Sequence, residues 1–386
     1  MDFELSDDQR RLQELVADFA RAEVEPRAEQ LDRDAVFPSD LYRKVGEIGI
    51  TSIPFTAKYG GMGLGTLDMA LAVEQLAMAD QSLAVTTMVS VASGLILERF
   101  GSEEQKARFL PAIVNGTGLG ALAGTEPQAG SDTASFTTRG RRTADGWTLD
   151  GQKAYITNAG TDLSTYALTL VVTSPPDADR KEFSLLLVPN GVPGYTQGEP
   201  YRKMGWRSSD TRPLFFDDCR LPGDAIVGSE GQGRFLLHKG YQQARVFLAA
   251  CSVGLAAAAL KRSIDYASER KAFGTSIGRL QLVQELIAKM AVKVDAARLL
   301  TYRAAWMGDR GTVTLRELAM AKYFACEIGT EVADLAIQVH GGWGFMDDCA
   351  VSRYYRDNRI CTIGDGSSQI QLLLIARAVG LDVQFG

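Results

Sequence analysis

The chain has 386 residues, of which 46% are hydrophobic and 23% are charged, a composition typical of a globular protein with two or three domains. Its formal net charge of −6 argues against nucleic acid and anionic membranes as partners, because both attract clustered lysine and arginine. Only two histidines are present, His238 and His340, which argues against a histidine-bound metal centre and a Ser-His-Asp triad. We therefore expect no metal site.

The cysteines and the N-terminus predict a cytoplasmic protein. Five cysteines are scattered without a Cys-x-x-Cys pair, a pattern typical of reduced and mostly buried thiols. The first twenty residues read MDFELSDDQRRLQELVADFA, and their acidic, amphipathic character differs from that of a signal or transit peptide. The longest apolar run, residues 247–260, is too short to span a bilayer and suits a buried helix.

Residues 1–118 are predicted to form an N-terminal helical domain. Apolar residues recur at helical spacing in LSDDQRRLQELVADFARAEV and in SEEQKARFLPAIV. The expected N-cap is Ser6 in the first segment and Ser102 in the second. Glycines precede another helical run in YGGMGLGTLDMALAVEQLA. Their spacing matches neither a dinucleotide-binding nor a P-loop motif, so we interpret them as a connection between helices.

Residues 119–230 are predicted to form a middle β domain. Short β-rich runs such as GWTLDGQKAYITNA, LSTYALTLVVTS and RPLFFDDCRLP are separated by turn sequences, which is typical of an antiparallel barrel or sandwich. Residues 231–386 return to long helical segments. The predicted fold class is therefore α+β, mostly α, and the absence of alternating strands and helices argues against a Rossmann domain.

Six motifs follow one another along the chain: LAGTEPQAGSD, DGQKAYITNAG, RKMGWRSSD, SERKAFGTSIGRLQ, IQVHGGWGF and YYRDNRICTIGDGSSQIQ. With these motifs in this order, the whole chain resembles the acyl-CoA dehydrogenase family of flavoproteins. The resemblance implies an N-terminal helical domain, a middle β domain and a C-terminal four-helix bundle. It also implies one FAD between the domains, and a homotetramer built as a dimer of dimers.

The resemblance assigns one group of residues to the flavin. Leu122, Gly124, Thr125, Gly130 and Ser131 match the strand and loop under the flavin ring, and Ser131 also lies near the acyl-CoA. Tyr155, Ile156 and Thr157 take the place of the family's usual Trp-Ile-Thr, in which the Thr hydroxyl faces flavin N5. Tyr155 departs from the family pattern but keeps an aromatic ring.

A second group matches residues that reach the FAD of a neighbouring subunit: Arg270, Phe273, Gln281, Gln338, Gly341 and Gly342. Glycine lets backbone amides approach a pyrophosphate closely, and an arginine can pair with that phosphate. Ser367 and Gln369 are assigned to the cofactor as well. Because two chains would hold each FAD, a monomer should bind it poorly.

The substrate residues implied by the resemblance are Ser131, Gln242, Arg245, Gly364 and Gly366. The family's reaction removes an α-proton from an acyl thioester, and most members use Glu as the base in a motif like Ile-Tyr-Glu-Gly-Thr. This chain reads Ile-Gly-Asp-Gly-Ser over residues 363–367, so Asp365 is the candidate catalytic base. Some branches carry the Glu on the helix of Arg245, at the position that is Ala244 here.

An Asp differs from a Glu more in reach than in acidity. Their ordinary pKa values differ by about 0.4 units, whereas a shift of about 1 Å in a reacting group can cost on the order of 100-fold in rate. We therefore expect either that thioesters with straight acyl chains are turned over slowly, or that the site is arranged for a shorter base. Gly364 replaces the usual Tyr of the acyl pocket and favours a branched or alicyclic acyl group. Alternatively, Tyr241, Phe247 or another side chain refills that space.

Several alternatives remain. Nitroalkane oxidases share the fold and use an Asp as proton acceptor at a comparable place. Some family members oxidise thioesters of acyl carrier proteins, and others bind DNA, which the acidic net charge argues against. The remaining alternative is that the protein has a structural role and that Asp365 has no catalytic function. The family expectation for the electron acceptor is an electron-transferring flavoprotein, with oxygen as the alternative.

Overall fold

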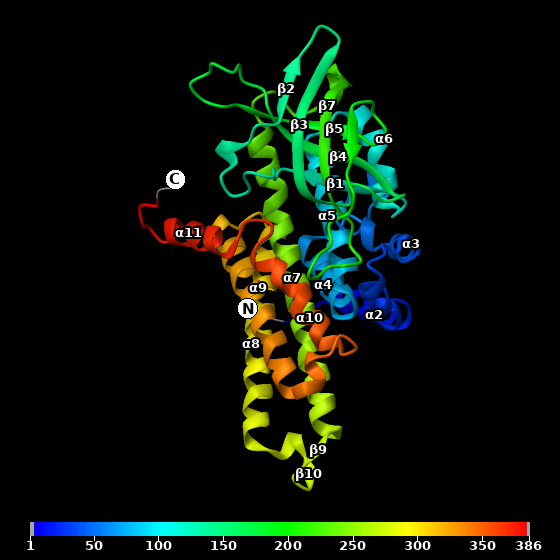
Figure 1. Cartoon of the computed structure of the whole chain (residues 1–386), viewed down its shortest axis with the longest axis vertical. Coiled ribbons are helices and arrows are strands. Elements are labelled where there is room, and N and C mark those ends of the chain that lie inside the picture. The colour runs from blue at the N-terminus through cyan, green and yellow to red at the C-terminus, as the bar shows by residue number, and fades with distance from the viewer. Residues whose placement is uncertain (1–3, 384–386) are drawn as a thin grey trace.

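The computed structural model describes residues 4–383. Figure 1 shows helices from the N-terminal part beside a β domain, with long helices extending away from the sheet. The N-terminal domain contains α1 (Asp7–Phe19), η1 (Ala20–Val24), α2 (Glu25–Asp34), α3 (Ser39–Glu47), η2 (Ile50–Ser52), η3 (Ala57–Tyr59), α4 (Thr66–Ala79), α5 (Gln81–Phe100) and α6 (Glu103–Val114). Ser6 and Ser102 are N-caps, as predicted, and each completes a capping box with a glutamine.

The middle domain is built on one eight-stranded sheet in the order β6-β7-β3-β2-β4-β5-β8, with β1 paired to β4. Its strands are β1 (Leu119–Ala123), β2 (Arg139–Arg142), β3 (Gly146–Thr157), β4 (Ser164–Val172), β5 (Phe183–Pro189), β6 (Tyr195–Gln197), β7 (Thr211–Pro222) and β8 (Ile226–Val227). Most neighbours are antiparallel, as predicted, but β1 runs parallel to β4. A parallel pair needs a long connection, and here that connection contains β2 and β3.

The C-terminal part is helical, which confirms the predicted fold class. It contains α7 (Gly233–Glu269), the hairpin β9 (Lys271–Ala272) and β10 (Thr275–Ser276), η6 (Ile277–Arg279), α8 (Gln281–Asp309), α9 (Leu315–His340), η7 (Gly341–Phe345), α10 (Ala350–Asn358), η8 (Arg359–Thr362) and α11 (Ser368–Ala378). The buried apolar side chains of α4, α5, α7, α8 and α9 belong to one hydrophobic cluster. In Figure 1 the β9–β10 hairpin lies at the end of these helices farthest from the sheet.

Two helices, α5 and α7, are long and apolar enough to cross a membrane by length and composition. Helix α7 extends well beyond the apolar run at residues 247–260 and has 37 residues, so its length alone would permit a span. However, the most apolar windows of α5 and α7 are 72% and 83% buried inside the protein. Both helices therefore have the burial of core helices.

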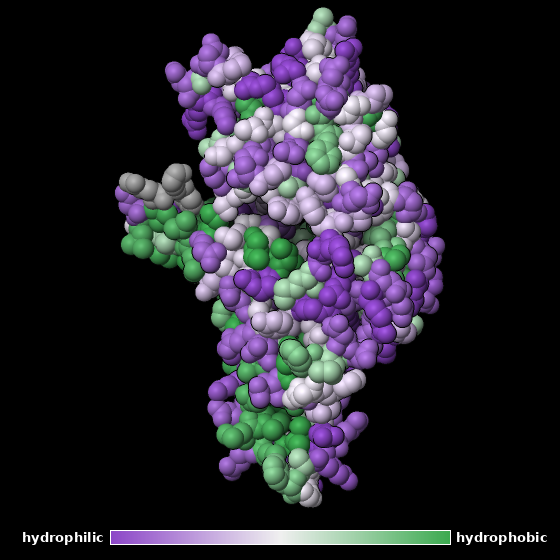
Figure 2. Space-filling view, viewed as in Figure 1, coloured by the Kyte–Doolittle hydropathy of each residue, from purple (hydrophilic) through white to green (hydrophobic). Residues whose placement is uncertain are grey.

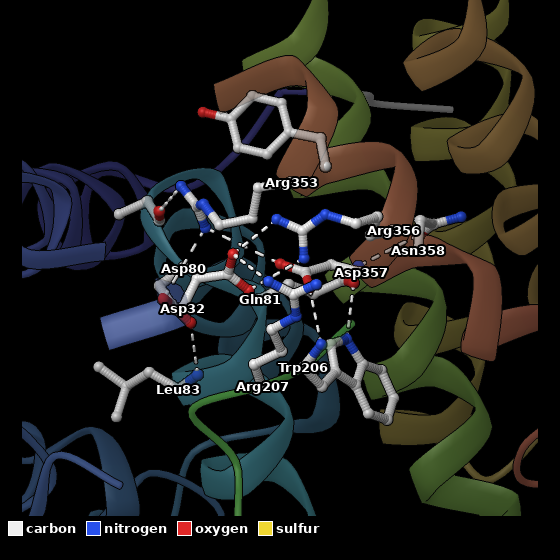
Figure 3. Close-up of polar contacts among 12 residues, drawn as sticks. Asp32, Asp80, Gln81, Leu83, Trp206, Arg207, Arg353, Arg356, Asp357 and Asn358 are labelled. Atoms are coloured by element: carbon white, nitrogen blue, oxygen red, sulfur yellow. Dashed lines mark hydrogen bonds and ion pairs between the residues drawn. The ribbon is translucent and has the colours of Figure 1, made fainter. Parts of the chain in front are cut away.

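A buried polar network joins the three parts of the chain (Figure 3). Arg356 on α10 donates to Asp32 on α2, with Nη1–Oδ1 at 3.1 Å. The Trp206 backbone N–H donates to Asp357 at 2.7 Å, and burial raises the pKa of that carboxyl to about 7. Arg353 lies 3.8 Å from Asp80, just before α5. The network anchors α10, and the segment that follows α10 leads to Asp365.

Candidate active site

Asp365 lies in the turn between η8 and α11. It has a left-handed backbone with φ +51, and Gly366 follows with φ +86. A Cβ added to Gly366 would lie 2.6 Å from Nε2 of Gln371, so both the backbone and the space require glycine. Ser367 then caps α11 by accepting from the backbone N–H of Ile370 at 3.4 Å. The Gly-Asp-Gly sequence therefore forms a tight turn, and the backbone geometry of this turn sets the direction of the Asp365 carboxylate.

Helix α7 brings two further side chains to this turn. Tyr241 and Arg245 are four residues apart and so lie on the same side of the helix. Arg245 is 5% exposed, and its Nε has no hydrogen-bond partner within residues 4–383. Across the site, a Cβ added to Gly124 would lie 3.0 Å from the Tyr241 hydroxyl. The end of β1, α7 and the Asp365 turn therefore meet at one place.

The charges at this place are coupled. Burial raises the pKa of Asp365, whereas Lys322 and Arg245 lower it. Burial also raises the pKa of Tyr241, and the charge of Asp365 raises it further. Within residues 4–383 no side chain or backbone group donates a hydrogen bond to the Asp365 carboxylate. A partly buried carboxylate with a raised pKa and free oxygens is the arrangement that a general base requires.

Two of the remaining predicted substrate residues lie around the carboxylate. Gln242 follows Tyr241 on α7 and is partly buried, and its side chain has no hydrogen bond within the described residues. A Cβ added to Gly364 would meet only the carbonyl oxygen of Ile360, at 3.6 Å. Residue 364 therefore leaves open space next to the base.

On the opposite side, the segment after β1 is fixed by an ion pair that the sequence analysis missed. Lys153 and Glu126 are 0% and 1% exposed, and their Nζ and Oε1 atoms lie 2.8 Å apart. Lys153 also donates to the Gly124 carbonyl at 3.0 Å. Burial lowers the pKa of Lys153 to about 8. A lysine within an otherwise strand-like run, two residues before Tyr155, was the available sequence signal.

The residues of this side fit a flavin. The backbone N–H of Ala154 donates to the carbonyl of Thr125 at 2.9 Å, which places the segment after β1 beside the end of β3. The hydroxyls of Thr125, Ser131 and Thr157 have no partner within residues 4–383, so they are free to bind a heterocycle or a phosphate. Leu122 is partly buried, whereas the Ile156 side chain packs in the core of the middle domain, so only the Ile156 backbone is available to a flavin. Gly130 leaves room beside Thr125.

Tyr155 has the left-handed φ of +61 and is 64% exposed. Its ring lies against that of Tyr201, with centroids 5.2 Å apart. A cavity of about 500 Å³ opens beside Tyr201 and contains none of the predicted site residues. Arginines line it, but three of them already pair with carboxylates: Arg33 with Asp348, Arg207 with Asp32 and Arg212 with Asp210. We therefore place the candidate site at Asp365 rather than in this cavity.

The second predicted FAD group lies elsewhere. Arg270 and Phe273 belong to the β9–β10 hairpin, Gln281 begins α8, and Gln338, Gly341 and Gly342 mark the end of α9. Within one chain this end of the helices lies far from the sheet (Figure 1), so the structure does not bring these six residues to Asp365. Phe273 is 94% exposed, and no atom lies within 4 Å of a Cβ added to Gly341 or Gly342.

Apolar side chains surround this distal group. Figure 2 shows hydrophobic surface over the far end of the helices and over α11. Large exposed apolar side chains in these regions are Leu282, Val292, Trp343, Phe345, Leu372 and Leu373. An exposed apolar patch of this kind is typical of a surface that another protein covers.

The comparisons with known proteins agree with this architecture. Family models of acyl-CoA dehydrogenase match in order along the chain: the N-terminal domain over residues 6–117, the middle domain over residues 121–219 and the C-terminal domain over residues 231–380. A probable acyl-CoA dehydrogenase of Bacillus subtilis, YngJ, is 40% identical over 381 residues, which cover 98% of this chain and 99% of the relative.

Solved structures are similar as well. Butyryl-CoA dehydrogenase from Megasphaera elsdenii has a TM-score of 0.94 at 32% identity, over 98% of this chain and 100% of that chain. The prolyl acyl carrier protein oxidase AnaB has a TM-score of 0.93 at 29% identity, over 98% and 100%. With three family models matched in order and relatives of this identity, the chain belongs to the acyl-CoA dehydrogenase family, whose members are FAD-dependent oxidoreductases that act on CH–CH groups.

Proposed function

We propose that the protein dehydrogenates an acyl-CoA thioester between its α and β carbons, with Asp365 as the base. The observation that carries this proposal is the Asp365 carboxylate, which accepts no hydrogen bond from residues 4–383 and is acted on by the charges of Lys322 and Arg245. The α C–H of a thioester is a weak acid, so its removal needs a carboxylate held against it. FAD, when bound, accepts the β-hydrogen as a hydride.

The chain's own residues have separate tasks in this mechanism. Asp365 takes the α-proton onto its carboxylate. Arg245 opposes the effect of burial on the pKa of Asp365, which favours the ionised form that can accept a proton. Thr125, Ser131 and Thr157 supply free hydroxyls on the sheet side and would hold the flavin there, with Leu122 and the backbone of Ile156 beside it. Buried Lys153 and Glu126 keep that segment in place.

The substrate is proposed to be branched or alicyclic at the α carbon. The proposal is supported by the surroundings of Gly364, because no atom of Tyr241 or Phe247 lies within 4 Å of a Cβ built on that residue. Tyr241 instead extends toward Gly124, and Phe247 is fully buried in the helical core. The open volume therefore lies next to the base, where a substituent on the α carbon needs room.

A second candidate is a thioester carried on an acyl carrier protein, because the similar structure of AnaB is described as a prolyl acyl carrier protein oxidase. The reacting end of such a substrate is the same as that of a CoA thioester. A nitroalkane is the third candidate, since Asp365 could accept its α-proton as well. The titration below separates all three.

The assembly is proposed to be a homotetramer in the cytoplasm. The six distal residues lie at the far end of the helices, and they could complete a cofactor site only on a neighbouring chain. The electron acceptor is proposed to be an electron-transferring flavoprotein, with oxygen as the alternative.

The deciding experiment is an anaerobic titration of the flavin-loaded protein. Flavin absorbance is followed while straight, branched and cyclic acyl-CoAs are added, then an acyl group bound to a carrier protein, and a nitroalkane is added last. Bleaching by the branched or cyclic class is the expected result. Faster bleaching by butyryl-CoA would overturn the substrate assignment. Bleaching only by the nitroalkane would overturn the dehydrogenase assignment, and bleaching only by a carrier-bound acyl group would replace CoA with the carrier.

A further inference from the structure

Lys322 lies on α9 and is completely buried. Its Nζ donates to the carbonyl oxygen of Gly366 at 2.8 Å. Among residues 4–383 this is the one hydrogen bond that Lys322 makes, and no carboxylate there lies within ion-pair distance of it. A buried ammonium is costly unless charge or hydrogen bonds compensate it. The position of this cation therefore needs a compensating negative group nearby.

Asp365 is that negative group. The charge of Lys322 acts on Asp365 more strongly than that of any other cation, including Arg245. The ammonium therefore lies behind the turn and holds the carbonyl that directly follows the base. The same carbonyl also accepts from Nε2 of Gln371 at 2.9 Å. Two donors thus hold the Gly366–Ser367 peptide, which lies one residue beyond the base, and so fix the turn that carries the Asp365 side chain.

The other titratable groups around Asp365 come from two elements, α7 and α9. Helix α7 contributes Arg245, Tyr241 and Cys251, and α9 contributes Cys326 one turn after Lys322. Burial raises the pKa of Cys251, which keeps that thiol neutral. Lys322 and Arg245 are therefore the two cations that face the carboxylate, and Lys322 is the one that also holds the turn.

We propose that Lys322 is a positioning residue for the catalytic base, holding the left-handed Asp365–Gly366 turn through the Gly366 carbonyl and supplying a positive charge to the Asp365 carboxylate. This inference rests on the proposed role of Asp365 as the base. The two tasks are separable, because the hydrogen bond needs only an N–H donor, whereas ionisation of Asp365 needs a positive charge.

Two variants of the flavin-loaded protein separate the tasks. Lys322→Gln keeps an N–H donor but loses the charge, and Lys322→Met loses both with little change in volume. Lys289→Gln is the control, because Lys289 lies on α8 in an exposed pair with Glu285. The rate of flavin reduction in a single turnover is measured across pH, together with the infrared band of protonated Asp365, which Asp365→Asn identifies.

For Lys322→Gln we expect the acid limb of the rate profile and the infrared titration to move together to higher pH, by about one unit or more. At the pH of its maximum, the rate of flavin reduction in Lys322→Gln should recover to within about threefold of the parent rate. In Lys322→Met the rate should stay at least about tenfold below the parent rate at every pH, because a misplaced base slows the reaction. Lys289→Gln should leave both readouts unchanged.

If the pH at which Asp365 titrates were unchanged in Lys322→Gln, the proposed effect of the Lys322 charge on Asp365 would be overturned. If Lys322→Gln and Lys322→Met had equal maximal rates, the proposed role of Lys322 in holding the turn would be overturned. If Lys322→Met does not fold, Lys322→Arg provides the second test: it keeps charge and donors, so it should restore the parent titration. Full turnover in Asp365→Asn would instead overturn the proposed function, and that result is distinguishable because it does not involve Lys322.

Discussion

The hydroxyl of Tyr241 lies so close to the backbone of Gly124 that an added Cβ would be 3.0 Å from it, and 3.2 Å from Cδ2 of Leu237. This approach joins the N-terminal part of the long helix α7 to the residue that follows β1. It closes the site on the side of the sheet, while Gly364 leaves it open next to Asp365. The shape of the candidate acyl site therefore depends on two glycines and one tyrosine.

Gly124→Ala should lower kcat/KM by about tenfold, because the new methyl displaces the tyrosine ring into the site. Tyr241→Phe removes the oxygen nearest to that methyl, so the double variant should recover part of the loss. Steady-state kinetics of the two single variants and the double variant form a complete cycle. Strictly additive effects would contradict the contact between these two residues.

Asp365→Asn should retain flavin and lose at least about two orders of magnitude in the rate of flavin reduction, the contribution typical of a general base. Asp365→Glu should also be slower, by about tenfold or more, because an added methylene moves the carboxylate by about 1 Å. Asp348→Asn is a surface control near the start of α10. A Glu variant faster than the parent would show that the site is not arranged for the shorter base.

The rate should depend on pH through Asp365 itself. Burial raises its pKa above the ordinary value, and only the ionised form accepts a proton. The rate should therefore fall as the pH drops through that raised pKa, which lies above the ordinary value of about 3.9. The pH profile of kcat/KM measures this directly. An acid limb at or below the ordinary value of an aspartate would contradict the raised pKa.

Glu126→Gln should destabilise the protein at neutral pH by about 3–5 kcal/mol, because it leaves the buried Lys153 ammonium without its partner. Burial opposes ionisation of Glu126, but Lys153 and the donors around it outweigh burial and hold its pKa at about 2, against 4.5 for a free Glu. A lowered pKa stabilises the folded state above pH 4.5, and this contribution disappears as the pH falls toward 2.

Thermal unfolding across pH tests this prediction. The difference in Tm between the parent and Glu126→Gln should be full between pH 4.5 and about 8, where Lys153 is protonated, and should narrow below pH 4.5. Glu285→Gln provides a control, since Glu285 forms an exposed pair with Lys289. A difference that stays constant down to pH 2 would show that the pair does not depend on the charge of Glu126.

Arg270 should serve the cofactor of a neighbouring chain. Arg270→Gln alone should lose FAD, and Asp365→Asn alone should keep FAD but not turn over. When the two variants are unfolded, mixed in equal amounts and refolded with FAD, about a quarter of the sites should combine an intact base with an intact Arg270. Recovered turnover in the mixture is the expected result. An inactive mixture of well-folded oligomers would contradict a shared site.

Local sequence patterns predicted much of the fold of this protein and part of its candidate site. The change from helical to alternating periodicity and back predicted the three-part fold, because burial of one face imposes a period on each element wherever it lies. The caps at Ser6 and Ser102 were readable for the same reason, since a cap bonds only to its own helix. The turn at Asp365 was likewise found in a short motif, whereas Arg245 was assigned to the substrate by resemblance alone.

Other features depended on which elements pack together. Lys322 is 44 residues from the carbonyl that it holds, and it is one lysine within an ordinary amphipathic helix. Lys153 and Glu126 are 27 residues apart and become a pair only when β3 lies beside the segment after β1. Neither contact produces a periodic pattern or a fixed spacing in the sequence, because each contact is set by the three-dimensional arrangement of separate elements.

The sequence by itself determined the order of the domains, the identity of the candidate base and the residue types assigned to the cofactor. The tertiary structure decided how these residues are grouped. It placed Thr125, Tyr241, Arg245 and Asp365 around one site and left Arg270 and its companions at the far end of the helices. The physical reason is that short-range hydrogen bonding and periodicity are encoded locally, whereas the distance between two side chains is set by how whole helices and strands pack.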